Sequence, residues 1–146
     1  SHVFGATITK VMTVEEGGSI VVWGSGEEER DLLYVSDLTD LFQRVIDKQS
    51  FKFGLFNAGY GSSISVKGLV QKIIVQSKKN INIEYDMTKP TIKTKICLDS
   101  TKAKDLLGWS PNVSIDEGIK KTLEWYKVNM ITAKSDKDRR KIYAKS

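Results

Sequence analysis

Several features that define other protein classes are scarce or absent in this sequence. Its one cysteine, Cys97, allows neither an internal disulfide nor a cysteine zinc cluster, so we expect a reducing, cytoplasmic setting. No apolar run approaches the ~18 residues of a membrane-spanning helix, and the first residues have no signal-peptide core. Hydrophobic residues make up 40% and charged residues 28%, which excludes collagen-like, disordered and disulfide-scaffold proteins.

A basic face is also missing from most of the chain. The net charge is +5, but residues 134–146 carry six basic and two acidic side chains, which leaves the other residues at +1. Nucleic-acid binding therefore has little support from the charge distribution. The 146 residues fit one domain, and we expect a folded portion at 1–130 followed by a basic tail at 131–146.

The usual nucleotide-binding loops do not occur either. No G-x-G-x-x-G follows a first strand, and no G-x-x-x-x-G-K-[ST] is present. Helical and strand patterns nevertheless alternate, which predicts an α/β fold. We expect strands at 19–23, 31–35, 53–57, 81–85 and 95–98, and helices at 3–16, 36–48, 101–107, after Ser65 and after Ser114. An α/β chain without a phosphate loop is typical of one part of a larger enzyme.

The most informative segment begins at Trp23-Gly24-Ser25-Gly26 and continues through Arg30. Its glycines allow a sharp turn after a strand, Trp23 could stack on a base, and Arg30 could fork onto a phosphate or carboxylate. Glutamates at 27–29 would repel a phosphate, so the turn itself is not a phosphate cradle. Taken alone, the segment could equally be a surface hairpin with a structural tryptophan and a salt-bridged arginine.

Four segments, in order, resemble the extended short-chain dehydrogenase/reductases, the family of nucleotide-sugar epimerases and dehydratases. They are W-G-S-G…R-D-L-L-Y-V-S-D-L at 23–38, N-A-G-Y-G with Ser63 and Ser65 at 57–65, D-S-T-K-A…L-G-W-S-P at 99–111 and E-G-I…T…W-Y at 117–126. The resemblance spans residues 1–127. It implies the C-terminal, substrate-binding part of a Rossmann-type enzyme, with helices around a small mixed sheet.

Within this family the chain is most similar to the GDP-L-fucose synthases. Ser1-His2-Val3, the W-G-S-G turn and D-M-T-K-P at 86–90 carry the similarity, although Gly5 and Thr91-Ile92 depart from the pattern. The resemblance implies NADPH-dependent 3,5-epimerisation and 4-reduction of GDP-4-keto-6-deoxy-mannose by the full-length enzyme. A UDP-sugar 4-epimerase or a sugar-nucleotide dehydratase is the alternative, and a non-catalytic nucleotide-sugar binding or assembly module is the alternative of another class.

The resemblance also implies roles for five residues and for no metal ligand. His2 corresponds to the histidine near the nicotinamide and the sugar ring, which would make it both cofactor-binding and the acid in epimerisation. Lys10 lies where relatives direct a basic residue to the GDP phosphates. Trp23 and Arg30 match nucleotide-diphosphate contacts, and Lys89 matches a substrate contact. Lys95 replaces the arginine of many relatives, whereas Asn57, Ser65 and Asp99 have the character of turn and cap residues.

The catalytic Y-x-x-x-K of the family is missing. Tyr85 and Lys89 have the spacing, but Tyr85 ends an alternating strand and Lys89 precedes Pro90, which disfavours a helix there. We therefore expect this chain alone to be inactive, with NADP(H) bound mainly by an N-terminal half outside it. The expected partner is a GDP-sugar, without nucleic acid or membrane, and the parent enzyme is expected to be a homodimer.

Overall fold

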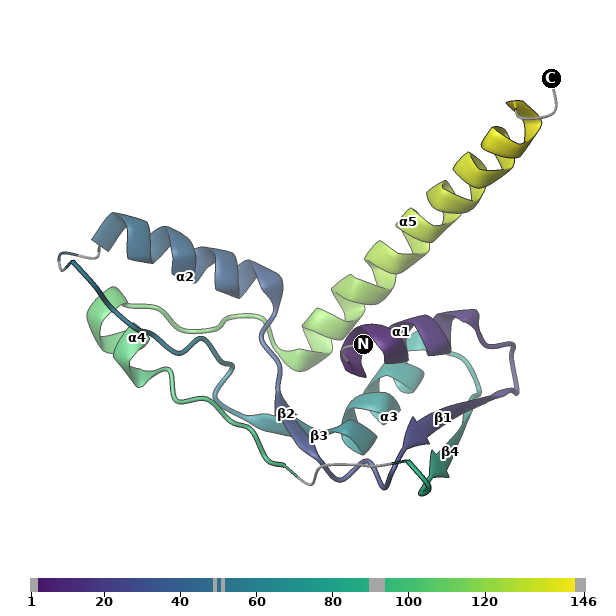
Figure 1. The fold of residues 1–146 in the computed structure, drawn as a ribbon, viewed down its shortest axis with the longest axis horizontal. Helices are drawn as coiled ribbons and strands as arrows, with labels where there is room; N and C mark the ends of the chain where they lie inside the picture. The colour runs from purple at the N-terminus through teal and green to yellow at the C-terminus, as the bar shows by residue number, and fades with distance from the viewer. Residues whose placement is uncertain (1–2, 49, 51, 90–93, 144–146) are drawn as a thin grey trace.

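The chain folds into two lobes and a projecting helix (Figure 1). The computed structural model describes residues 3–48, 50, 52–89 and 94–143, and for residues 130–143 it describes the helical backbone alone. The elements follow the order α1 (Val3–Thr13), β1 (Ser19–Trp23), β2 (Glu29–Asp31), α2 (Val35–Lys48), β3 (Ser63–Ser65), α3 (Val66–Ser77), β4 (Asn82–Asp86), α4 (Thr101–Leu107) and α5 (Ile115–Tyr143). The fold is α/β with small sheets, as the alternating pattern predicts.

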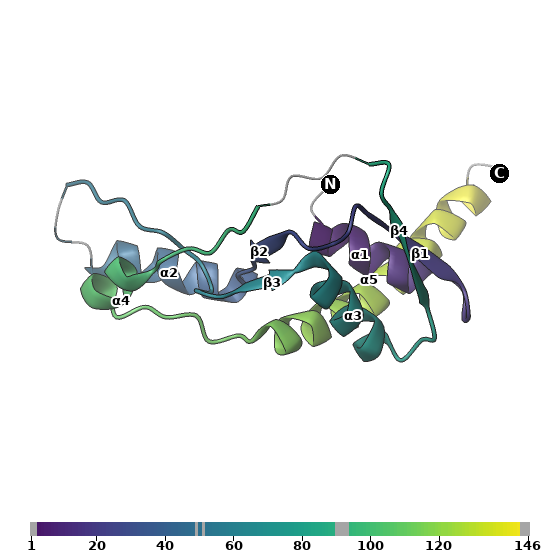
Figure 2. The same ribbon diagram turned by 90° about the horizontal axis from the view of Figure 1, so that it is seen from below.

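The larger lobe is built on two parallel strands. β1 pairs with β4 from Ser19↔Asn82 to Trp23↔Asp86, and helices α1, α3 and α5 lie beside this pair (Figure 2). The buried core draws on α1, β1, α3, α5 and the residue before β4, and consists of Ile8, Val11, Ile20, Val22, Val66, Leu69, Val70, Ile73, Ile81, Ile119 and Leu123. β1 buries Ile20 and Val22 and exposes the three residues that alternate with them, so one face of the strand packs on the core and the other is open.

The smaller lobe packs α2 against α4. Its buried core is small and consists of Leu41, Ala103, Leu107 and Trp109. The Nε1–H of Trp109 donates to the main-chain oxygen of Asp37 at 2.9 Å. The buried Asp37 carboxylate accepts the main-chain N–H groups of Asn112 and Val113 at 3.1 and 3.0 Å. These bonds fix the start of α2 to the chain that follows α4, and they satisfy a carboxylate that would otherwise be costly to bury.

A short antiparallel pair connects the lobes. β2 pairs with β3 from Glu29↔Ser65 to Asp31↔Ser63, and both views place this pair between α2 and the β1–β4 strands (Figures 1 and 2). α3 follows β3 directly, because Ser65 accepts the N–H of Gly68 at 3.1 Å and caps the helix as predicted. The connection therefore positions residues near Arg30 between the two lobes.

Three further helix ends are confirmed. Gly108 adopts a left-handed conformation with φ of 65° and ends α4. At the start of α4, Asp99 Oδ1 accepts the N–H of Thr101 at 2.9 Å, so Asp99 supplies the cap. At the start of α5, Ser114 Oγ accepts the N–H of Glu117 at 3.2 Å.

Three strand expectations needed correction. The strand expected at 31–35 lies at Glu29–Asp31, because α2 already begins at Val35. Residues 53–57 are extended but pair with no other described strand, and Phe53 and Leu55 are 82% and 73% exposed. Residues 95–98 contribute a single bridge, Glu29↔Lys95. An alternating pattern indicates an extended backbone, whereas a strand also needs a neighbour to pair with.

α5 continues through most of the expected tail. Its backbone is helical to Tyr143, so 131–143 extends the helix that begins at Ile115. Trp125 on this helix is 62% exposed. Among the described residues, no helix is both long enough and apolar enough to cross a membrane.

Candidate functional site

A pocket of about 360 Å³ lies between α1, β1 and the start of α3. Its walls are mostly apolar and include Val21, Val66 and Val70. Two of the residues singled out from the sequence, Lys10 and Trp23, line the same pocket. An apolar hollow with a few polar side chains at its edge is typical of a small-molecule site.

Lys10 reaches the pocket from the last turn of α1. Its Nζ donates to the main-chain oxygen of Val21 at 2.7 Å, which ties the helix to the middle of β1. A Lys ammonium has three donors, so this bond leaves two for an anion in the pocket. Lys10 therefore lines the pocket with donors to spare, and its contact with a phosphate stays a prediction.

Trp23 and Lys89 face each other at the carboxyl end of the parallel strands. Trp23 is the last residue of β1 and is 59% exposed, and the Lys89 Nζ lies 5.8 Å from its ring centroid. Lys89 follows β4 in a turn anchored by Asp86, whose carboxylate accepts the N–H and the hydroxyl of Thr88. These two bonds lower the pKa of the Asp86 carboxyl below its usual value. The turn therefore presents an aromatic face and a cation together.

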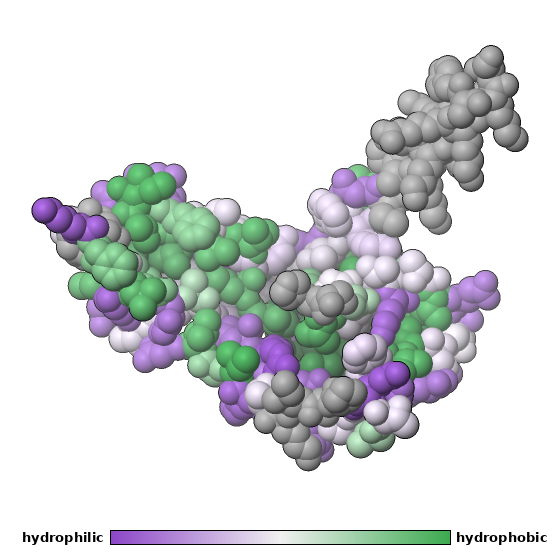
Figure 3. Space-filling view, in the orientation of Figure 1, coloured by the Kyte–Doolittle hydropathy of each residue, from purple (hydrophilic) through white to green (hydrophobic). Residues whose placement is uncertain are grey.

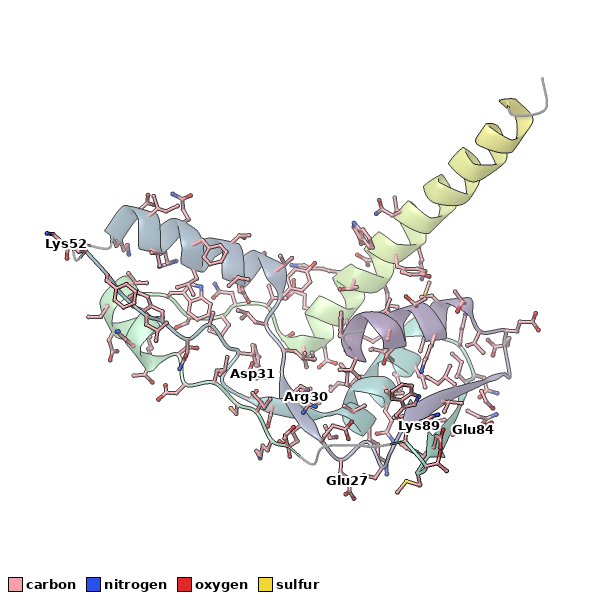
Figure 4. All side chains as sticks on the ribbon, viewed as in Figure 1. Glu27, Arg30, Asp31, Lys52, Glu84 and Lys89 are labelled. Atoms are coloured by element: carbon pink, nitrogen blue, oxygen red, sulfur yellow. The ribbon has the colours of Figure 1, made fainter. Side chains whose placement is uncertain are left out.

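Arg30 lies on β2, away from Lys89 (Figure 4). Its Nη1 donates to Thr94 Oγ1 at 2.8 Å and to the main-chain oxygen of Glu29 at 2.9 Å. Both acceptors are neutral, and no carboxylate pairs with Arg30 within residues 3–89 and 94–129 that the structure describes. Among these residues Arg30 is therefore not the salt-bridged arginine of the surface-hairpin alternative. Its guanidinium charge is not neutralised by them, so it can attract an anion.

Asp31 is a connecting residue that the sequence analysis missed. Its carboxylate accepts three main-chain N–H groups, from Tyr60 at 2.7 Å, Gly61 at 3.0 Å and Leu98 at 3.0 Å. It thereby holds the glycine turn and the segment before α4 against β2. The signal available in the sequence was the acidic residue directly after Arg30, but its partners lie about 30 and 67 positions away.

Two expected positions remain to be placed. His2 lies outside the described residues. Tyr85 is on β4 and Lys89 is in the turn after it, so they do not share a helical turn and the Y-x-x-x-K arrangement is not formed. A second pocket, of about 400 Å³, lies by the glycine turn at 59–61 and the start of α4, and it contains none of the expected binding residues.

The glycine turn after β1 does not have the form of a dinucleotide cradle. After β1, Gly24 and Gly26 take left-handed φ values of 67° and 71° and lead into β2. A dinucleotide cradle instead needs a glycine turn that opens a helix, whose N-terminal N–H groups hold the pyrophosphate. The turn at Gly24 and Gly26 leads into a strand and therefore offers no such cradle.

Comparison with known proteins gives a consistent result. A family model described as GDP-mannose 4,6 dehydratase matches residues 2–122. The chain is 31% identical over 134 residues to GDP-L-fucose synthase 1 of Arabidopsis thaliana, covering 89% of this chain and 40% of that protein. This chain thus spans about two fifths of the length of the curated relative.

Solved structures share the fold. An epimerase from Methanothermobacter thermautotrophicus superposes with a TM-score of 0.80 at 22% identity, over 92% of this chain and 40% of that one. The UDP-glucose 4-epimerase of Bifidobacterium longum, solved with NAD+ and UDP, gives a TM-score of 0.74 at 22% identity, over 88% and 40%. Both matches cover the same share of the longer proteins.

Proposed function

Since the chain belongs to the GDP-mannose 4,6 dehydratase family, we propose that it is the nucleotide-sugar-binding part of a GDP-L-fucose synthase. The family comprises nucleotide-sugar epimerases, reductases and dehydratases that use a nicotinamide cofactor. In this proposal the pocket between α1 and β1 takes the nucleoside end of a GDP-sugar. Trp23 and Lys89 border the base and Lys10 and Arg30 hold the diphosphate.

The observation that carries the proposal is the shared wall of the pocket. Lys10 and Trp23 come from different elements and line one apolar hollow. Lys89 joins them through the Trp23 ring. A stacking aromatic beside two cations suits a base attached to phosphates, since the ring covers the base while the cations attract the negative charge.

The remaining chemistry is assigned to a longer polypeptide. NADP(H) and the Tyr-Lys pair would come from a portion outside this chain, and His2 would donate the proton during epimerisation. The exposed apolar residues support this division. Phe42 and Ile46 on α2 are 56% and 77% exposed, and Phe53 and Leu55 continue the same apolar surface, which Figure 3 shows over α2 and the segment after it. Such a surface is typical of a face that packs against another folded part.

A UDP-sugar 4-epimerase remains the second candidate, because a solved relative of that activity holds UDP and covers 88% of this chain. Nucleotide titrations of the 146-residue chain, followed by tryptophan fluorescence, decide between the two. We expect GDP to change the fluorescence and to bind at least several-fold more tightly than UDP, with no tight binding of NADPH and no turnover.

The matched variants are Trp23→Phe and Trp125→Phe. Trp23→Phe should remove most of the fluorescence change, whereas Trp125→Phe, an exposed tryptophan on α5, should retain it. Tighter binding of UDP would favour the 4-epimerase. Tight binding of NADPH, or turnover by this chain, would contradict the division of labour proposed here.

A further inference from the structure

The arginine proposed to hold the diphosphate directly follows three glutamates. Glu27, Glu28 and Glu29 precede Arg30 without interruption, and each carboxylate opposes the approach of an anion. Coulomb's law at the dielectric of a protein surface gives roughly a 4- to 15-fold loss of diphosphate binding for one uncompensated charge within about 10 Å. Glu29 is adjacent to Arg30, so its charge matters to the site.

The Glu29 carboxylate is bound by two neighbouring side chains, on the side of β2 away from Arg30. Lys95 Nζ lies 3.1 Å from its Oε2, and the hydroxyl of Ser63 on β3 donates to the same oxygen. The main chain sets this register, because Glu29 N donates to Thr94 O at 2.9 Å and Ile96 N donates to Glu29 O at 3.3 Å. Lys95 is therefore placed beside Glu29 by the backbone.

The hydrogen bond from Ser63, and then the bond from Lys95, lower the pKa of the Glu29 carboxyl below its usual value. The carboxylate consequently stays ionised throughout the neutral range. Protonation therefore does not remove the negative charge of Glu29 at neutral pH, and only a nearby positive charge can cancel its repulsion of an anion.

Arg30, by contrast, contacts neutral acceptors. Neighbouring side chains on a strand point to opposite faces, which separates the Arg30 guanidinium from the Glu29 carboxylate. The Nη1 of Arg30 donates to Thr94 and to the Glu29 main chain, so these bonds orient the guanidinium without neutralising it. The bridge between β2 and residues 94–96 thus holds the Arg30 guanidinium, without a carboxylate partner, on one face and the Glu29–Lys95 ion pair on the other.

We propose that Lys95 is a positioning residue that serves the anion site through Glu29: it cancels the Glu29 charge, so that the full positive charge of Arg30 acts on the diphosphate. The inference rests on the proposed function of Arg30. It differs from a direct contact between Lys95 and the substrate, because it makes the effect of Lys95 depend on the presence of Glu29.

The test is a charge cycle on the 146-residue chain, with GDP as the probe and calorimetry as the measurement. Lys95→Met leaves one net negative charge and should weaken GDP binding by about 4- to 15-fold. Glu29→Gln leaves one net positive charge and should strengthen it. The double variant restores the original balance and should bind within about threefold of wild type.

The second half of the test separates the possible failures. A double variant as weak as Lys95→Met would overturn the inference, because Lys95 would then act directly or through the fold. Lys72→Met, which opens the Lys72–Asp116 ion pair on the far side of α3, is the matched control and should leave binding unchanged. Lys95→Arg should keep wild-type affinity. If wild type binds no GDP, or Arg30→Ala has no effect, the proposed function itself fails.

Discussion

Arg30 is the residue whose proposed contact with the diphosphate can be tested most directly. Its guanidinium has no acidic partner among the described residues, and a charge-assisted contact contributes about 1.5–3 kcal/mol. Arg30→Ala should therefore weaken GDP binding by roughly 10- to 150-fold in calorimetry. Arg44→Ala removes a comparable guanidinium, bonded to Asp40 on α2, and should leave the affinity unchanged. Equal affinities for wild type and Arg30→Ala would exclude the assignment.

Gly59 lies so close to its neighbours that no side chain fits at this position. A Cβ built at Gly59 would lie 2.5 Å from the Cβ of Leu98 and 2.8 Å from Asp31 Oδ2. Gly59→Ala should destabilise the chain by about 1–3 kcal/mol in chemical denaturation, since the connecting residue Asp31 would have to move. Gly5→Ala is the control: it meets nothing within 4 Å in α1 and should stabilise the helix slightly. A Gly59→Ala variant as stable as wild type would contradict the close approach.

Elements with local signals were predicted well, whereas those with distant partners were not. α3 and α4 begin at side chains that bond within three residues, and a sequence shows such caps directly. The extended segment at 53–57 and the bridge at Lys95 depend on what lies beside them, which no local pattern encodes. The same applies to the site. Trp23 and Arg30 were visible as a motif, but Asp31 gains its role from Tyr60 and Leu98, far along the chain.

The start of α4 should depend on pH through its cap. Hydrogen bonds from the Thr101 side chain and then from its N–H lower the pKa of the Asp99 carboxyl below its usual value in the folded chain. A lowered carboxyl pKa stabilises the fold above the unfolded value, and this contribution is lost as pH falls through the folded value. The melting temperature of wild type should therefore fall below about pH 4, and Asp99→Asn, which keeps an oxygen acceptor without titrating, should fall less. Parallel curves for both proteins would show that the cap does not titrate.

At the scale of the molecule, the apolar surface of α2 should govern association. Phe42 and Ile46 expose apolar surface to water. Because burying that surface against a second copy is favourable, we expect the isolated chain to form dimers or larger species as its concentration rises. The double variant Phe42→Ser and Ile46→Ser should remain monomeric in light scattering. Val75→Ser changes an equally exposed residue on α3 and should not alter the association. A monomeric wild type at all concentrations would argue against a docking face on α2.

The parallel pairing of β1 with β4 also determines when the chain can fold during synthesis. Ser19 and Asn82 are 63 positions apart, and the core beneath them still needs Ile119 and Leu123 from α5. A ribosome must therefore have released nearly all of this segment before the larger lobe can close. Until then the apolar residues of α1, β1 and α3 remain uncovered. We expect ribosome-bound chains that end before α5 to be digested rapidly by protease, and chains that expose α5 completely to resist it.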